Sequence, residues 1–231
     1  MHVKGWVKSS LIDYPERIAA SLFCGGCNFR CPHCQNGQIV AHPDEHPDIP
    51  EQEIWAFLEA RHRLLDGVVI SGGEPTLEAD LLRFAARLRE MGFLVKLDTN
   101  GYLPNVLEGM ITGGMVDYVA MDIKAPPAKY ALVAGVEVDL SRIERSIALL
   151  CQEKVLYEFR TTVVPEVLAE HDIAQIAQWI AGARRYYLQQ FVAQGTLDPG
   201  MLTRIPYTPQ RLEKMAAAAR QYVEHVAVRG T

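Results

Sequence analysis

The chain alternates short apolar runs with longer amphipathic segments, and this alternation restricts its fold more than any other feature. The apolar runs are rich in β-branched and aromatic residues and are nearly continuous in hydrophobic character. Such runs are typical of parallel strands that are covered on both faces. We expect six strands, at residues 18–23, 67–72, 93–99, 116–124, 155–163 and 186–192.

The segments between these runs carry the periodicity of helices. In one of them Leu81, Phe84 and Leu88 fall on a single apolar stripe. In the last, Thr208 precedes Pro209, which is the usual order of a cap residue and a first-turn proline. We expect helices at residues 51–65, 77–92, 104–111, 140–151, 172–181 and 209–225.

Six strand-then-helix units in succession indicate a single α/β domain with right-handed crossovers. A complete eight-unit barrel typically needs about 250 residues, whereas this chain has 231. The expected fold class is therefore α/β, an incomplete (β/α)6 TIM-like barrel that is open on one side. Within this single domain we expect an N-terminal hairpin or extension at 1–17, the partial barrel at 18–192, and a C-terminal loop and helix at 193–231.

The composition excludes several other classes of protein. A net charge of −5 with 49% hydrophobic residues is an ordinary globular balance, and it does not favour binding to nucleic acid or to an anionic membrane. No apolar run approaches the roughly 20 residues that cross a bilayer, and the N-terminus lacks the pattern of a signal peptide. We therefore expect a cytoplasmic location, where thiols stay reduced. Five cysteines, four of them clustered, also make a poor disulfide framework.

Polar residues stand at the ends of the expected strands. The second to fifth strands end in, or run into, the segments SGGEPT, DTNG, MDIK and FRTT, and a cluster of cysteines follows the first strand. In α/β folds with parallel strands the active site lies at the carboxyl ends of the strands. We therefore expect these five segments, far apart in sequence, to meet on one rim.

The cysteines of this cluster are Cys24, Cys27, Cys31 and Cys34. Four-thiolate zinc sites usually consist of two Cys-x2-Cys pairs separated by about a dozen residues or more, and no such spacer is present here. Two-cluster ferredoxin runs have a different order and end in Cys-Pro. The spacing of the last three cysteines favours an iron–sulfur site over a zinc site.

The spacing Cys27-x3-Cys31-x2-Cys34 resembles the signature of the radical S-adenosylmethionine (radical SAM) enzymes. The resemblance implies that these three thiolates are the metal ligands, holding three irons of a [4Fe–4S] cluster. It also implies that the open fourth iron binds the amino and carboxylate groups of S-adenosylmethionine. Reduction of the cluster would then cleave the cofactor and release a 5′-deoxyadenosyl radical, so that the cofactors carry the chemistry and the protein positions them.

The segment GGEP, Gly72 to Pro75, resembles the part of these enzymes that binds the methionine amino group through backbone carbonyls and Glu74. Two glycines, Gly72 and Gly73, allow the main chain to approach a ligand closely. A plain strand-to-helix turn is the alternative interpretation of GGEP taken alone.

A narrower resemblance covers about the first three quarters of the chain. SLIDYPERIAASLFCGGCNFRCPHCQN, LDTNG, MDIK and RTTVVP resemble segments of the glycyl-radical-enzyme activating enzymes in the same order, and most of all the short activating protein of anaerobic ribonucleoside-triphosphate reductase. The resemblance implies that the nucleotide and the methionine carboxylate are bound by Asp98, Asp122, Lys124 and Arg160. It adds His33, Asn36 and Asn100 to the cofactor pocket, and it gives Asp13 a role in positioning the substrate's glycine loop.

Three positions depart from the pattern of the activating enzymes. His33 replaces the common aromatic residue before the last cysteine, and Gln35 stands where histidine is usual. Glu16, rather than glycine, follows the proline of the N-terminal hairpin. Cys24 is better read as a packed side chain than as a fourth ligand. Asp98 and Asp122 could each cap the following helix instead of binding a cofactor.

The expected function is activation of a glycyl radical enzyme, most similar to that of anaerobic ribonucleoside-triphosphate reductase, with a low-potential electron donor such as flavodoxin or ferredoxin. One alternative keeps both cofactors but acts on a small molecule, as 7-carboxy-7-deazaguanine synthase does. A second alternative is a non-catalytic metal-binding interaction protein, in which Cys24 completes a closed site of four thiolates.

Overall fold

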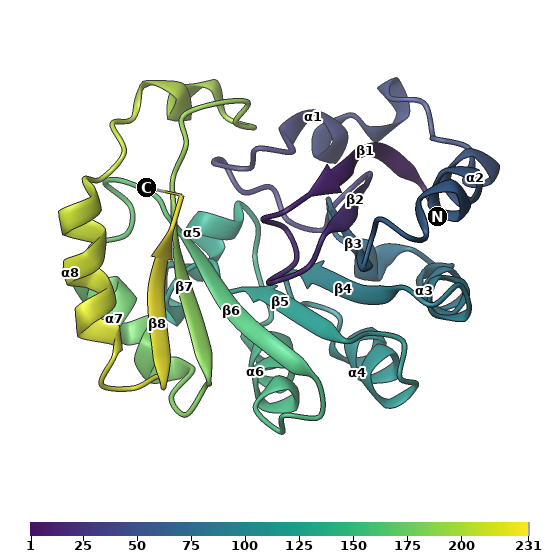
Figure 1. The fold of residues 1–231 in the computed structure, drawn as a ribbon. Coiled ribbons are helices and arrows are strands. Elements are labelled where there is room, and N and C mark those ends of the chain that lie inside the picture. The colour runs from purple at the N-terminus through teal and green to yellow at the C-terminus, as the bar shows by residue number, and fades with distance from the viewer. Residues whose placement is uncertain (231) are drawn as a thin grey trace.

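The computed structural model describes residues 1–230, which form one eight-stranded sheet in the order β1-β2-β3-β4-β5-β6-β7-β8 (Figure 1). Strand β1 is antiparallel to β2, and every later neighbour is parallel. The strands are β1 (Val3–Ser10), β2 (Ala19–Cys24), β3 (Gly67–Gly72), β4 (Leu94–Thr99), β5 (Tyr118–Asp122), β6 (Leu156–Val163), β7 (Arg185–Gln190) and β8 (His225–Arg229). Because β1 and β8 do not pair with each other, the sheet curves into a barrel that stays open between them, which confirms the expected partial barrel.

Helices follow the parallel strands and cover the outer face of the sheet (Figure 1). They are α1 (Gly37–Ala41), α2 (Glu51–Arg61), α3 (Leu81–Glu90), α4 (Pro104–Thr112), α5 (Tyr130–Ala134), α6 (Leu140–Leu150), α7 (Glu170–Trp179) and α8 (Pro209–Ala219). Among the described residues no helix is long and apolar enough to span a membrane. The apolar stripe predicted from the sequence of α3 faces the core, where Leu81, Phe84 and Leu88 are at most 1% exposed.

The six expected strands are confirmed, each end lying within two residues of its prediction, but the structure adds β1 and β8. The predicted last helix was wrong at its end, because α8 stops at Ala219 and the chain turns back into β8. The segment 193–231, expected to be loop and helix, therefore also contributes a strand. One sheet runs from β1 to β8 across residues 17 and 192, so the division of the chain at these points stays a prediction.

Side chains of the parallel strands alternate between the helices and the barrel interior. Val95 and Leu97 of β4 are fully buried within the main apolar core, whereas Lys96 and Asp98 project to the opposite face. The interior of this barrel is therefore rich in charged groups. One of them, Glu158 of β6, is completely buried and bonds to Arg229 of β8. This contact reaches over β7 and holds the last strand of the open barrel.

Candidate active site

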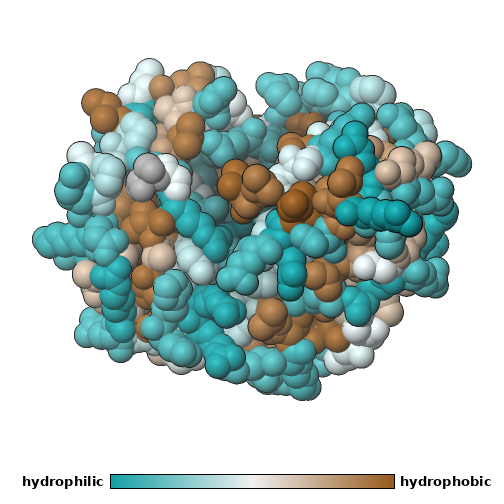
Figure 2. Space-filling view, in the orientation of Figure 1, coloured by the Kyte–Doolittle hydropathy of each residue, from teal (hydrophilic) through white to brown (hydrophobic). Residues whose placement is uncertain are grey.

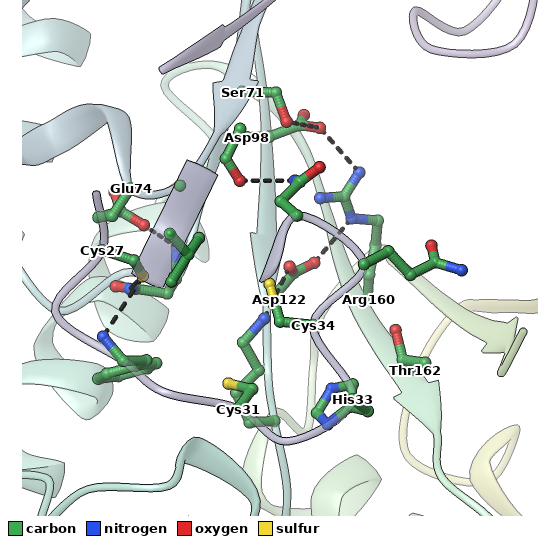
Figure 3. Close-up of a pocket in the computed structure, with 18 of the residues that line it drawn as sticks. Cys27, Cys31, His33, Cys34, Ser71, Glu74, Asp98, Asp122, Arg160 and Thr162 are labelled. Atoms are coloured by element: carbon green, nitrogen blue, oxygen red, sulfur yellow. Dashed lines mark hydrogen bonds and ion pairs between the residues drawn. The ribbon is translucent and has the colours of Figure 1, made fainter. Parts of the chain in front are cut away.

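A cavity of about 240 Å³ lies at the carboxyl ends of the parallel strands (Figure 3). The structure brings most of the site residues expected from the sequence into its lining. These are Cys27, Cys31, His33, Cys34, Asn36, Gly72, Gly73, Glu74, Asp98, Asn100, Asp122, Lys124 and Arg160. Pro75 and Asp13 are not part of the lining. Segments separated by more than a hundred residues thus meet on one rim because parallel strands end at the same edge of a sheet.

The loop that carries the three cysteines follows β2 directly and is tied down from two sides. The backbone N–H of Arg30 donates to the carbonyl of Ala134 at 2.8 Å. On the other side, Leu197 N–H donates to the Cys34 carbonyl at 3.0 Å, and Asp198 N–H donates to the Pro32 carbonyl at 2.9 Å. The segment after β7 therefore closes over the cysteine loop.

The three cysteine side chains point toward one part of the cavity, where Figure 3 shows them. Burial raises the pKa of Cys27 to about 12 and that of Cys31 to about 11, so both are thiols without a metal. Metal binding would displace their protons, and the charge of the metal would offset the cost of buried thiolates. Three soft sulfur donors in one cavity are the ligand set that iron–sulfur clusters use. The residues present therefore fit a [4Fe–4S] cluster held by Cys27, Cys31 and Cys34.

Cys24 lies outside this ligand set. It is the last residue of β2, it is fully buried, and it does not line the cavity. Burial also raises the pKa of its thiol. Its backbone carbonyl accepts a hydrogen bond from Gly73 N–H at 2.8 Å, which joins β2 to the glycine turn. This placement favours the interpretation of Cys24 as a packed side chain over that of a fourth ligand.

The two glycines after β3 are required by the close approach of their turn to the cysteine loop. Gly72 has a φ of +106°, and a Cβ at Gly73 would lie 1.7 Å from the Gly26 carbonyl oxygen. The side chain of Asn36 donates to the Gly72 carbonyl at 2.7 Å, which fixes the direction of that carbonyl. The glycine turn is thus positioned by the cysteine loop on both sides.

Glu74 is buried and joins the turn after β3 to the turn after β4. Its carboxylate accepts hydrogen bonds from Thr76 N–H at 3.1 Å, Thr99 Oγ1 at 2.7 Å and Asn100 N–H at 2.7 Å. Burial raises the pKa of Glu74, and these donors act in the opposite direction. The carboxylate thus holds the rim together, while its expected contact with a methionine amino group stays a prediction. Sequence reasoning missed Thr76 and Thr99, which are ordinary residues in a loop sequence.

Five charged side chains form a continuous row along one side of the cavity. Lys96 bonds to Asp98, and Asp98 accepts from Arg160 at 3.2 Å. Arg160 Nε donates to Asp122 at 2.9 Å, and Asp122 accepts from Lys124 Nζ at 3.0 Å. The row alternates cation and anion, and three cations against two anions leave one positive charge in excess. A ligand with one carboxylate suits this row.

The charges of the row set the protonation states of its members. Burial raises the pKa of Asp98, but Arg160 and Lys96 outweigh burial and hold that pKa below its ordinary value. Asp122 behaves in the same way, with Arg160 and Lys124 lowering its pKa. Burial lowers the pKa of Lys124, but Asp122 outweighs it and the net shift is upward. All of these groups are therefore charged at neutral pH.

Other residues of the site were missed or stand apart. Lys96 is 2% exposed and was not expected, although a lysine inside the apolar run FLVKLDT was a signal for it. Burial lowers the pKa of His33 to about 3, so the imidazole is neutral. Asp13 lies in the connection between β1 and β2, where its carboxylate accepts from Ser21 Oγ at 2.7 Å. The remaining unexpected lining residues include Ser71, Thr162, Gln189 and Gln190.

Solved structures of other proteins share this fold. A domain of pyruvate-formate lyase-activating enzyme from Bacteroides vulgatus superposes with a TM-score of 0.57 at 17% identity, covering 71% of this chain and 99% of that one. Streptococcus suis SuiB bound to S-adenosylmethionine superposes with a TM-score of 0.67 at 16% identity, covering 89% of this chain and 48% of that one. At these identities the likeness concerns the fold alone.

Sequence comparison identifies the family. A protein of Methanocaldococcus jannaschii named "Putative glycyl-radical enzyme activating enzyme MJ1227" is 35% identical over 98% of this chain and 95% of its own length. A 7-carboxy-7-deazaguanine synthase of Methanopyrus kandleri is 30% identical over 44% of this chain and 47% of its own. The model of the radical SAM superfamily matches residues 21–180. This chain therefore belongs to the radical SAM superfamily, whose enzymes use a [4Fe–4S] cluster and S-adenosylmethionine in oxidoreductase-type chemistry.

Proposed function

We propose that this chain activates a glycyl radical enzyme by removing the Cα hydrogen atom of a glycine in that partner. The observation that carries the proposal is the position of the cavity: the three thiols and the charged row share a rim in a barrel that is open between β1 and β8. A protein loop needs such a lateral opening to reach a buried reaction centre. The relative from Methanocaldococcus jannaschii, similar along nearly its whole length, supports the same function.

Reductive cleavage of S-adenosylmethionine at the cluster would consume one electron, yield methionine, and transfer the glycine hydrogen atom to the 5′-deoxyadenosyl group. The residues of this chain would supply binding and position. Cys27, Cys31 and Cys34 would hold three irons of the cluster. Lys124 and Arg160 would bind the methionine carboxylate, because the charged row has one cation more than it has anions.

The finer parts of the proposal concern the partner and its surroundings. We infer that the partner is an anaerobic ribonucleoside-triphosphate reductase and that the electron donor is a flavodoxin or ferredoxin. A cytoplasmic location belongs to the same proposal. Asp13 would position the glycine loop, and its place in the connection between the two strands at the β1 edge supports this role.

The proposal is tested by anaerobic reconstitution with iron and sulfide, followed by incubation with S-adenosylmethionine, a low-potential reductant and a panel of glycyl radical enzymes. We expect a glycyl-radical EPR doublet on one partner. Cys31→Ala should lose the cluster iron and the doublet, whereas the matched variant Cys24→Ala should keep both. Cofactor cleavage that no glycyl radical enzyme uses, but that a small molecule stimulates, would instead support the deazaguanine-synthase type of function.

A further inference from the structure

Cys27 has hydrogen-bond donors around its sulfur that the other two cysteines of the triad lack. The backbone N–H of Phe29 lies 3.3 Å from Cys27 Sγ, and the side-chain amide nitrogen of Asn100 lies 3.8 Å from it. Within residues 1–230 no side chain donates to the sulfur of Cys31 or Cys34. The corner of the cavity at Cys27 is therefore electrostatically different from the other two.

The orientation of the Asn100 amide is determined by its other contacts. Its Oδ1 accepts from Tyr102 N–H at 2.9 Å, and its Nδ2 donates to Asn28 Oδ1 at 2.8 Å. A flipped amide would lose both bonds, so the NH2 group, and not the oxygen, faces Cys27. The backbone N–H of Asn100 donates to Glu74, and the residue is only 5% exposed. Asn100 is therefore held rigidly beside the sulfur.

A second carboxamide at the same corner has an unused donor. The Nδ2 atom of Asn28 is buried and has no hydrogen-bond partner in the part of the chain that the structure describes. Its oxygen is already taken by Asn100. A buried donor without a partner costs about 1–3 kcal/mol, so this atom indicates an acceptor that the protein itself does not supply. Sulfur atoms of a bound cluster are acceptors of this kind.

We propose that Asn100 is a positioning residue that donates an N–H···S hydrogen bond to the Cys27 thiolate and raises the reduction potential of the cluster. The inference rests on the cluster that the proposed function also requires. A reduced cluster carries one more negative charge than an oxidised one, and a fixed donor stabilises the more negative state more strongly. Asn100 thereby makes it easier for an electron donor to reduce the cluster.

The test is the reduction potential of the reconstituted cluster, followed by EPR during an anaerobic redox titration without any partner. In Asn100→Ala we expect a more negative potential with unchanged iron content. At a fixed ambient potential the ratio of reduced to oxidised cluster should fall roughly fivefold, as expected for loss of one hydrogen bond. Asn100→Asp keeps the shape and the acceptor for Tyr102 N–H but loses the amide donor, so at alkaline pH it should shift the potential in the same direction.

Ser146→Ala is the matched control. Ser146 Oγ donates to the carbonyl of Gly101 at 2.6 Å, so this variant loosens the same turn without touching Cys27. Its potential should equal that of the wild type. An unchanged potential in both Asn100 variants, or an equal shift in Ser146→Ala, would overturn the inference. A shift confined to the Asn100 variants would support it even if no partner acquires a glycyl radical, a result that would count against the proposed function alone.

Discussion

Lys96 lies inside the barrel, 2% exposed, with the carboxylate of Asp98 as its ion-pair partner. A buried ammonium group loses its hydration, and this loss is tolerated only when a close anion and hydrogen bonds replace the water. Asp98 in turn accepts from Ser71 Oγ at 3.2 Å and from Arg160. A single residue that sequence reasoning overlooked thus orients the first carboxylate of the charged row.

Replacing Lys96 by methionine removes this cation while keeping most of the side-chain volume. We expect the free energy of unfolding to fall by about 2 kcal/mol, because a hydrogen bond to a charged group is lost. Binding of S-adenosylmethionine should weaken, since Asp98 is no longer held from below. Denaturant unfolding and equilibrium dialysis measure the two effects. Lys154→Met, at an exposed position, is the control, and an equal loss in both variants would contradict the prediction.

The charged row also predicts how stability depends on pH. Because the pKa of Asp122 is lowered in the folded state, its contribution is present above its unfolded pKa of about 3.9 and is lost as pH falls through the folded pKa. Asp122→Asn should therefore be less stable than the wild type at pH 7, and the difference should shrink toward acid. Urea unfolding at several pH values measures this, and a difference independent of pH would contradict it.

At the scale of elements, β8 is the strand at one open edge, and a single buried ion pair anchors it across the barrel. Arg229 donates to the two oxygens of Glu158 at 2.7 and 2.9 Å, and Tyr118 donates to Glu158 at 2.7 Å. The guanidinium group also lies 3.3 Å from the ring centroid of Tyr187. These contacts connect β8 to β5, β6 and β7.

Arg229→Met should leave the buried carboxylate of Glu158 without its cation. We expect a loss of about 3 kcal/mol in the free energy of unfolding, the usual cost of breaking one side of a buried pair. Adding Glu158→Gln should restore part of it, because the uncompensated charge is then removed. Denaturant titration measures both steps. Arg184→Met, whose partners are exposed, should cost less than about 1 kcal/mol, and no recovery in the double variant would contradict the prediction.

At the scale of the whole molecule, the barrel is open between β1 and β8, and Figure 2 shows a hollow on this side with hydrophobic atoms beside it. The turn after β1 presents two large apolar side chains to solvent, Leu11 at 73% and Ile12 at 89% exposure. They precede Asp13, to which the proposed function gives a role in holding the partner's loop. Exposed apolar side chains beside an opening suit contact with a protein partner.

Ile12→Asp should lower the rate of glycyl-radical formation about tenfold, as expected when an apolar contact worth roughly 1.4 kcal/mol is lost. Cleavage of S-adenosylmethionine without a partner should not change, since the turn does not line the cavity. EPR quantification and chromatography of 5′-deoxyadenosine measure the two rates. Leu82→Asp, on the outer face of α3, is the control, and equal losses in both variants would count against docking at the turn.

The expectations from sequence succeeded where the signal is local. The six inner strands are continuous apolar runs, so their positions could be read directly, whereas β1 and β8 are half-exposed edge strands with mixed sequences. The last helix was drawn too long because QYVEH continues its apolar pattern, although α8 ends at Ala219. The lining of the cavity was largely anticipated, because each of its motifs follows a strand.

The sequence by itself determined the α/β alternation, the open barrel and the three cysteines that identify the family, because these depend on spacing and periodicity along the chain. Only the tertiary structure decided which side chains meet. That Cys24 is packed away, that Lys96 bonds to Asp98, and that Asn100 faces Cys27 all depend on strand register and turn conformation. These contacts join residues far apart in the chain or depend on which way a buried side chain turns, and no local pattern encodes either.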